Sequence, residues 1–130
     1  MSRKSVLFML VLLAATAGVA SAVGTGLRAE YFEFAGGSPP ADPFLPSGSR
    51  YVQIDPTIDF QWGNGSPANI RADDFAVRWT GKVEPPTTAS YTFATRTDDG
   101  VRLWVDGQLL NDLWTNHGNT VVSGTIALTA

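Results

Sequence analysis

The strongest constraint on the fold is the alternation of side-chain character between residues 91 and 107. In two successive runs the larger apolar side chains occupy every second position: Tyr91 and Phe93, then Val101, Leu103 and Val105. A two-residue period is the period of a β-strand, whose successive side chains point to opposite faces. Asp106-Gly107 follows the second run and favours a two-residue hairpin, because both central positions of a type I′ turn need a positive φ. The segment therefore predicts two strands followed by a tight turn.

The same strand pattern extends over most of the chain. Further strands are expected at residues 27–34, 51–62 (interrupted by Pro56), 75–83, 108–112 and 121–128. Residues 35–50 are rich in glycine and proline, which is typical of a surface excursion or a binding loop. Apolar residues show no sustained 3.6-residue period, so little helix is expected. Many short strands with Gly/Pro turns predict an all-β fold, an antiparallel sandwich or barrel.

The first 22 residues have the layout of a secretory signal peptide. Arg3 and Lys4 form a basic start, residues 6–19 are apolar, and Ala20-Ser21-Ala22 is a small-residue cleavage site. The apolar run is short and rich in small residues for a membrane span, although an uncleaved anchor is the alternative. We expect a mature domain from Val23 to Ala130 that is secreted, periplasmic or held at the cell surface, without membrane insertion after cleavage.

Charge and composition exclude several functions. Removal of the leader leaves seven basic and twelve acidic residues, a formal net charge near −5, which disfavours nucleic acid and anionic membranes as partners. The chain has no cysteine and a single histidine, His117, which is too few ligands for a zinc site. No nucleophile motif is present, and no two acids stand out as the acid and base of a glycosidase. The expectation is a domain that is not an enzyme, with no catalytic residue.

The turn Asp98-Asp99-Gly100 places two carboxylates side by side, as at the tip of a hairpin. Asp and Gly favour turns whatever the function, since the Asp side chain bonds local backbone donors. The alternative is a bound cation that offsets the repulsion between the two charges. A second pair, Asp73-Asp74, precedes a strand without a glycine turn, and we interpret it as a solvated strand edge.

Five segments in order resemble the PA14 domain family. They are GLRAEYF (26–32), DFAVRWTG (74–81), EPPTTASYTF (84–93), DDGVRLWVDG (98–107) and NDLWTNHG (111–118). The resemblance covers nearly everything from Gly24 onward. It implies a β-sandwich or barrel-like module of the kind found in toxins, glycosidases and adhesins, many of which bind carbohydrate. The family continues past the position of Ala130 with further strands, so we expect an incomplete domain whose last strand, at residues 121–128, exposes an edge.

The resemblance also implies a metal and a ligand. Lectin members of the family hold calcium with adjacent aspartates joined by a cis peptide, and Asp98 and Asp99 fall on that pair. A later loop supplies further ligands, for which Asn116 and Asn119 are candidates. Candidate glycan contacts are Trp104, Trp114, Asn116 and His117. For both tryptophans core packing remains the alternative, because aromatic side chains most often serve the core.

The expected function is that of a secreted carbohydrate-binding module that recognises glycan with the help of calcium. The alternative is a structural or protein-interaction module, or a fragment of a larger cell-surface enzyme or adhesin without activity of its own. In either case further domains of a longer chain are possible partners.

Overall fold

The computed structural model describes residues 26–36, 41, 51–67 and 69–130 in full, and residues 6–12 as backbone. Its elements are eight strands: β1 (Val6–Leu12), β2 (Leu27–Glu33), β3 (Tyr51–Asp55), β4 (Phe75–Gly81), β5 (Ala89–Thr97), β6 (Val101–Val105), β7 (Gln108–Leu113) and β8 (Thr120–Leu128). The described part of the chain contains strands and turns without a helix, and so no helix long and apolar enough to cross a membrane. The prediction of an all-β fold is confirmed.

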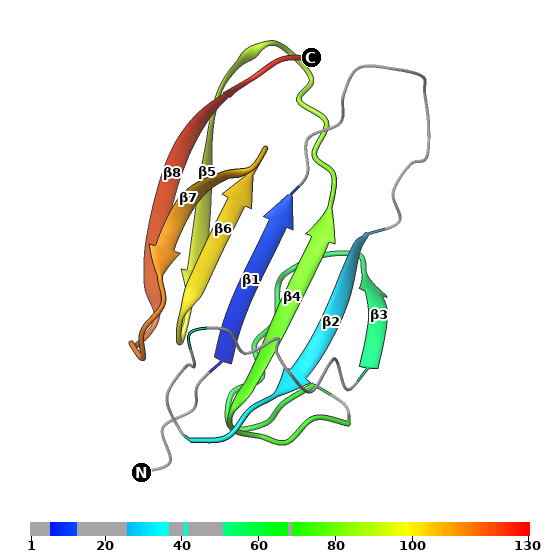
Figure 1. The fold of residues 1–130 in the computed structure, drawn as a ribbon, viewed down its shortest axis with the longest axis vertical. Coiled ribbons are helices and arrows are strands. Elements are labelled where there is room, and N and C mark those ends of the chain that lie inside the picture. The colour runs from blue at the N-terminus through cyan, green and yellow to red at the C-terminus, as the bar shows by residue number, and fades with distance from the viewer. Residues whose placement is uncertain (1–5, 13–25, 37–40, 42–50, 68) are drawn as a thin grey trace.

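Six strands form the larger sheet, in the order β3-β2-β4-β1-β6-β7 (Figure 1). The pairs β2–β3, β2–β4 and β6–β7 are antiparallel. β1 lies between β4 and β6 and runs parallel to both. The sequence analysis assigned these seven residues to a leader peptide, so their place inside the sheet was not anticipated.

The remaining strands, β5 and β8, form a two-stranded antiparallel sheet in which Ala89 pairs with Leu128 and Thr97 with Thr120. This sheet packs on the β6–β7 half of the larger one through an apolar cluster contributed by both layers: Val83, Tyr91, Phe93, Leu103, Val105, Leu110, Ile126 and Leu128. The alternation predicted for β6 is confirmed, because Val101, Leu103 and Val105 are buried while the residues between them are half-exposed. The protein is therefore a two-layered β-sandwich.

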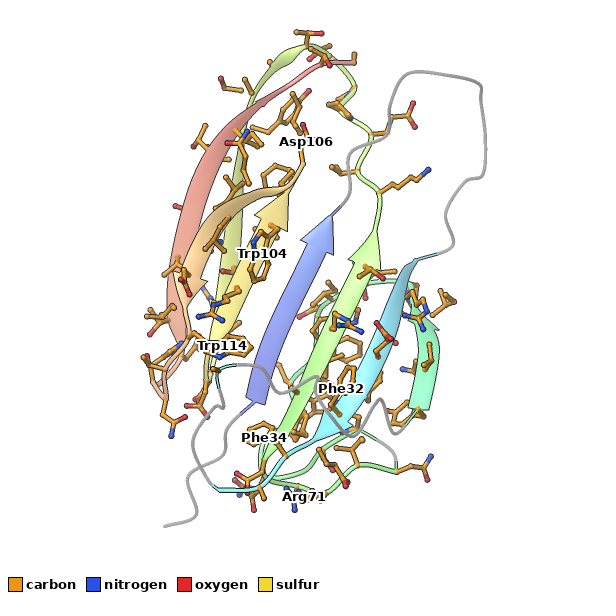
Figure 2. All side chains as sticks on the ribbon, in the orientation of Figure 1. Phe32, Phe34, Arg71, Trp104, Asp106 and Trp114 are labelled. Carbon is orange, nitrogen blue, oxygen red and sulfur yellow. The ribbon has the colours of Figure 1, made fainter. Side chains whose placement is uncertain are left out.

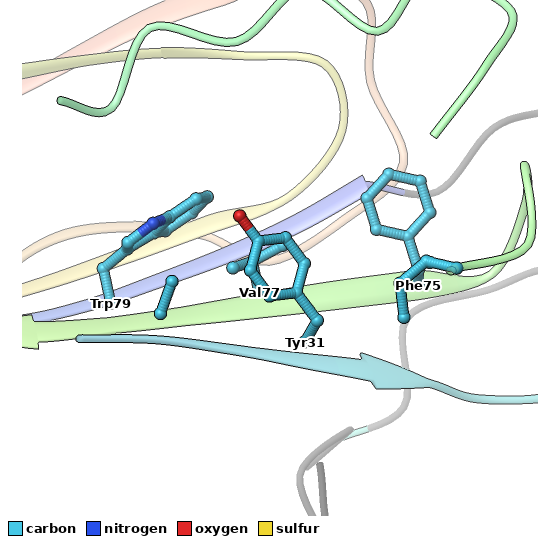
Figure 3. Close-up of a cluster of buried hydrophobic side chains, with 6 residues drawn as sticks. Tyr31, Phe75, Val77 and Trp79 are labelled. Carbon is cyan, nitrogen blue, oxygen red and sulfur yellow. The ribbon is translucent and has the colours of Figure 1, made fainter. Parts of the chain in front are cut away.

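A second core lies on the β2–β4 half of the larger sheet (Figure 3). Tyr31 from β2 and Phe75, Val77 and Trp79 from β4 are at most 1% exposed. Phe60 and Trp62, which follow β3, are half-buried against this group, and Phe60 stacks on Trp79 with ring centroids 5.9 Å apart. Trp79 therefore belongs to this core, and Trp62 packs against it.

One buried carboxylate ties three strands of this half together. Asp55, at the end of β3, is 3% exposed and accepts hydrogen bonds from Tyr31 Oη (2.6 Å) and from Trp79 Nε1 (2.7 Å). Gln53 Nε2, on β3 itself, donates to the other carboxylate oxygen at 2.5 Å. Burial, followed by the hydrogen bond to Asp55, raises the pKa of Tyr31 far above its usual value. A buried charge is tolerated here because three donors compensate its loss of water.

One expectation needs correction, one lies mostly outside the described residues, and one is confirmed. The strand predicted over residues 51–62 ends at Asp55, immediately before Pro56, because proline lacks the N–H that a continuing ladder needs. Most of the loop predicted at residues 35–50 lies outside the described residues. The type I′ turn is confirmed, with φ of 48° at Asp106 and 74° at Gly107.

Candidate functional site

The acidic turn connects the two layers of the sandwich. Asp98 and Asp99 follow β5, which belongs to the smaller sheet, and precede β6, which belongs to the larger one. The expectation of a hairpin tip was therefore wrong: β5 pairs with β8 and β6 with β7. The peptide bond between the two aspartates is cis, the geometry that the family resemblance implies. Asp98 is exposed, whereas Asp99 is only 5% exposed.

A hydrogen bond joins this turn to the loop between β7 and β8. The main-chain N–H of His117 donates to Oδ1 of Asp99 at 2.9 Å. The resemblance placed calcium ligands on the turn and on a later loop, and the structure brings these two segments together. Asn116 is half-buried next to His117 in the chain, while Asn119 is exposed immediately before the first residue of β8.

The donor chemistry of the turn and loop suits a hard cation. Asp98 and Asp99 offer carboxylate oxygens, Asn116 offers an amide oxygen, and the loop offers main-chain carbonyls; calcium takes six to eight such oxygen ligands. Among the residues that the structure describes, no three His, Cys, Asp or Glu side chains gather as a metal centre. A calcium ion here would thus depend on amide, carbonyl and water oxygens beyond the two carboxylates.

The imidazole of His117 is turned toward its own loop. Its Nδ1 lies 2.6 Å from the carbonyl oxygen of Gly118, and its Nε2 is buried. Thr120 Oγ1 donates to the same carbonyl at 2.7 Å. The ring therefore closes the loop, and the contribution of His117 to the site is its main-chain N–H.

The structure shows the packing role that was considered for Trp114. Its half-buried side chain packs against the cluster of Phe32 and Ala76 on β2 and β4. The Arg102 guanidinium lies over the indole, 4.8 Å from the ring centroid. The indole is thus engaged in packing, against the same cluster as Phe34.

Trp104 is half-exposed on β6, further along the strand from the acidic turn (Figure 2). The β6–β7 register shifts just before it: Leu103 pairs with Asn111, whereas Trp104 pairs with Leu109. The structure therefore separates the two tryptophans along the sheet and places Trp114 nearer the turn.

Arg102 and Asn111 hold parts of the site in place, a role that the sequence analysis did not predict for either residue. Arg102 Nε donates to Asp112 Oδ1 at 2.9 Å, so the cation over Trp114 is held in place by a carboxylate. Asn111 is 2% exposed and its Nδ2 donates to Thr95 Oγ1 (3.0 Å), joining β7 to β5 across the layers. The alternation along β6 indicated that Arg102 lies on the face opposite the buried residues of that strand. No sequence signal identified Thr95 as the partner of Asn111.

The second acidic pair is more constrained than a solvated edge. Asp73 and Asp74 are half-buried, and Asp74 has a φ of 56°. The Asp74 carbonyl accepts a hydrogen bond from the Phe34 N–H at 2.9 Å, and its carboxylate lies 3.9 Å from Arg71. The pair shapes the entry to β4, which corrects the earlier interpretation.

Comparison with known proteins agrees with this architecture. Residues 25–130 match the model of the PA14 domain. Anti-sigma-I factor RsgI3 of Acetivibrio thermocellus is 48% identical over 113 residues, which cover 86% of this chain and 16% of that protein. A solved structure of an anti-sigma factor domain-containing protein is also 48% identical, with a TM-score of 0.71, over 82% of this chain and 34% of that one. The chain thus spans about one sixth of the curated relative and one third of the solved chain.

Proposed function

Because the chain belongs to the PA14 domain family, we propose that it is a carbohydrate-binding module that recognises glycan through calcium at the acidic turn. The observation that carries the proposal is the 2.9 Å hydrogen bond from the His117 N–H to Asp99. It joins the turn that would hold the ion to the loop that would contact the sugar. A cation and a saccharide could therefore be bound by one continuous surface made of two chain segments.

Asp98 and Asp99 would hold the ion, with Asn116 and loop carbonyls as further oxygen donors. The bound ion would supply positive charge that attracts saccharide hydroxyl oxygens. Asp99 is buried and held by the loop, so its position is set before any ligand arrives. Asp98 is exposed and can adjust. Pre-organisation of this kind reduces the entropy lost on binding.

Trp114 is the better placed of the two tryptophans to contact a sugar ring. Saccharides present apolar C–H faces to aromatic side chains, and Trp114 follows β7 at the start of the loop that contains Asn116 and His117. Arg102, stacked on the indole, adds donors for hydroxyl groups at the same place. Trp104 is an outer contact that only an extended glycan would reach.

The proposed role is binding without catalysis. Neither the family description nor the relatives' names denote an enzyme. A glycosidase needs two carboxyl groups that face each other across the substrate. The two carboxylates of the acidic turn are adjacent in the chain and do not have this arrangement.

Calcium titration by calorimetry, followed by a glycan array with and without chelator, tests the proposal. Asp98→Asn and Asp99→Asn should remove the calcium heat and the calcium-dependent rise in melting temperature. Asp106→Asn is the matched control, because it makes the same chemical change at the other end of β6. Unaltered glycan binding in chelator would contradict the role of the ion. No calcium heat in the folded wild-type protein would contradict the metal site itself.

A second candidate follows from the relatives. Both are named as anti-sigma factor proteins, and this chain corresponds to only part of each. In a regulatory chain of that kind the module would act as a structural or protein-interaction domain, or as the part that senses glycan. Glycan binding on the array separates the sensing role from a purely structural one.

We further propose that residues 1–22 direct export and are removed after Ala22. The basis is the basic start, the apolar run and the Ala20-Ser21-Ala22 site. N-terminal sequencing of exported protein should begin at Val23. A sequence that begins at Met1 or Ser2 would contradict cleavage.

A further inference from the structure

We propose that Thr97 and Asn111 hold a buried water molecule between the two layers of the sandwich, behind the acidic turn. Through this water the two side chains position the turn for a bound cation. The hydration site is argued from the contacts of the two side chains alone, whereas the positioning role rests on the calcium site proposed above.

The inward face of β5 changes from apolar to polar toward the acidic turn. Tyr91 and Phe93 pack in the apolar cluster between the layers. Thr95 and Thr97 follow them on the same face, because side chains alternate along a strand. Thr97 is only 8% exposed. A hydroxyl buried to this extent normally has a hydrogen-bond partner, so this end of the interlayer space requires polar groups.

Asn111 brings an amide to the same region from β7, in the opposite layer. It is 2% exposed, and its Nδ2 lies 3.0 Å from Thr95 Oγ1 and 3.3 Å from the carbonyl oxygen of Val122. A carbonyl oxygen can only accept a hydrogen bond, so the amide nitrogen faces Val122 and Oδ1 is directed elsewhere. The surroundings of Asn111 therefore fix the orientation of its amide group.

Two buried oxygen atoms then need partners. Neither Oδ1 of Asn111 nor Oγ1 of Thr97 has a hydrogen-bond partner among the residues that the structure describes. Burial of a polar atom without a partner is costly, and buried polar atoms in proteins usually bond to protein groups or to ordered water. The two atoms are complementary toward water, because the amide oxygen accepts while the hydroxyl can donate or accept.

The spacing of the two side chains suits one bridging water. Asn111 contacts β5 at Thr95, and Thr97 lies two residues further along the same face, about 7 Å away along the strand. A direct hydrogen bond between two oxygens spans about 3 Å, and a bridge through one water spans about 5–6 Å. The water would donate to Asn111 Oδ1 and bond to Thr97 Oγ1, and buried waters commonly have two to four such partners.

The position of Thr97 in the chain connects this bridge to the acidic turn. Thr97 is the last residue of β5, and Asp98 follows it directly. The other side of the turn is held by the hydrogen bond from the His117 N–H to Asp99. With the water bridge, the turn would be fixed on both sides to segments that lie outside β5 and β6. Its carboxylates would then need little further ordering when a cation binds.

Magnetic relaxation dispersion of isotope-labelled water oxygen counts long-lived internal waters, and it tests the hydration site without an added ligand. In the full-length chain, Thr97→Val keeps the shape of the side chain and should lose a long-lived water, and Asn111→Leu should lose the same one. Thr97→Ser should retain it. Thr92→Val is the matched control on the exposed face of β5, where the hydroxyl bonds to Thr125. Equal hydration of wild type and Thr97→Val would overturn the inference.

Calcium titration by calorimetry tests the positioning role. Thr97→Val should weaken calcium binding about tenfold, which is typical for loss of a group that orients a metal ligand. Thr97→Ser should restore most of the affinity, and Thr92→Val should bind as wild type does. A purely structural role would lower the melting temperature and leave the affinity of the folded protein unchanged.

The two measurements separate the possible failures. Unchanged calcium affinity in Thr97→Val would overturn the positioning role. No calcium heat in the wild type would overturn that role together with the proposed calcium site. In both cases the relaxation measurement still decides whether Thr97 and Asn111 hold a water.

Discussion

The main-chain N–H of His117 donates a hydrogen bond of 2.9 Å to Oδ1 of Asp99, a residue 18 positions earlier in the chain. The contact fixes the cross-layer turn to the β7–β8 loop with an atom that every residue except proline possesses. The hydrogen bond should therefore form with any side chain at position 117 and should be lost only when the N–H is removed.

Replacement of His117 by proline should destabilise the protein more than replacement by alanine. Proline removes the donor to a buried carboxylate, and hydrogen bonds to charged groups contribute about 2 kcal/mol. His117→Pro should lower the free energy of unfolding by about that amount, while His117→Ala should change it by less than about 1 kcal/mol. Urea unfolding of both variants provides the comparison. If alanine is as destabilising as proline, the ring and not the N–H secures the loop.

Loss of the buried carboxylate at Asp55 should be among the most damaging single changes. Asp55→Ala leaves the Tyr31 hydroxyl and the Trp79 indole N–H buried without their acceptor. Each such donor costs about 1–3 kcal/mol, so a loss of about 3 kcal/mol or more is expected. Asp59→Ala, an exposed aspartate four residues on, is the control and should be nearly neutral. Denaturant midpoints measure both. Similar midpoints for the two variants would contradict the anchoring role.

Glu30 should make stability depend on acid pH. Its hydrogen bond with Arg78, and then that with Arg28, lowers the pKa below the usual 4.5 against the opposing effect of burial. A carboxylate with a lowered folded-state pKa stabilises the protein above its unfolded pKa, and this contribution is lost as the pH falls through the folded value. Wild type should therefore exceed Glu30→Gln in stability at pH 7, and the difference should shrink toward pH 3. Melting curves across this range would refute the assignment if the difference stayed constant.

Close approach of the two layers at Gly124 should forbid a side chain there. A Cβ at this position would lie 2.7 Å from the Leu110 carbonyl oxygen and 2.8 Å from the Leu110 Cβ. Gly124→Ala should cost about 1–3 kcal/mol, because β7 and β8 would have to separate. At Gly118 a Cβ would meet nothing within 4 Å, so Gly118→Ala is the matched control. Thermal melts that show equal loss for both would contradict the close contact.

Local periodicity made much of the fold predictable. The alternation of β6 and the Asp106-Gly107 turn depend on neighbouring residues, and the structure confirms both. The pairing of strands is a non-local property, which is why the acidic turn was taken for a hairpin when it connects two sheets. β1 illustrates the same limit, because an apolar run of seven residues fits a leader and a buried strand equally well.

The candidate site was predictable only in part. Adjacent acids before a glycine are visible in the chain, and family resemblance pointed to a later loop as their partner. The particular atoms that meet were not predictable, since a main-chain N–H leaves no mark in the sequence. The inward orientation of the His117 ring and the stacking of Arg102 on Trp114 depend equally on tertiary contacts.

The Asp106-Gly107 turn lies at the far end of β6 from the acidic pair (Figure 2). Both of its residues are exposed, and so is the next residue, Gln108, which lacks the positive φ of Asp106 and Gly107 and can carry a modified side chain. It is thus a natural attachment point: a fluorophore, an affinity tag or immobilisation chemistry placed there would leave the candidate binding surface free. Surface-based binding measurements on this protein can use that orientation, with the acidic end directed toward the solution.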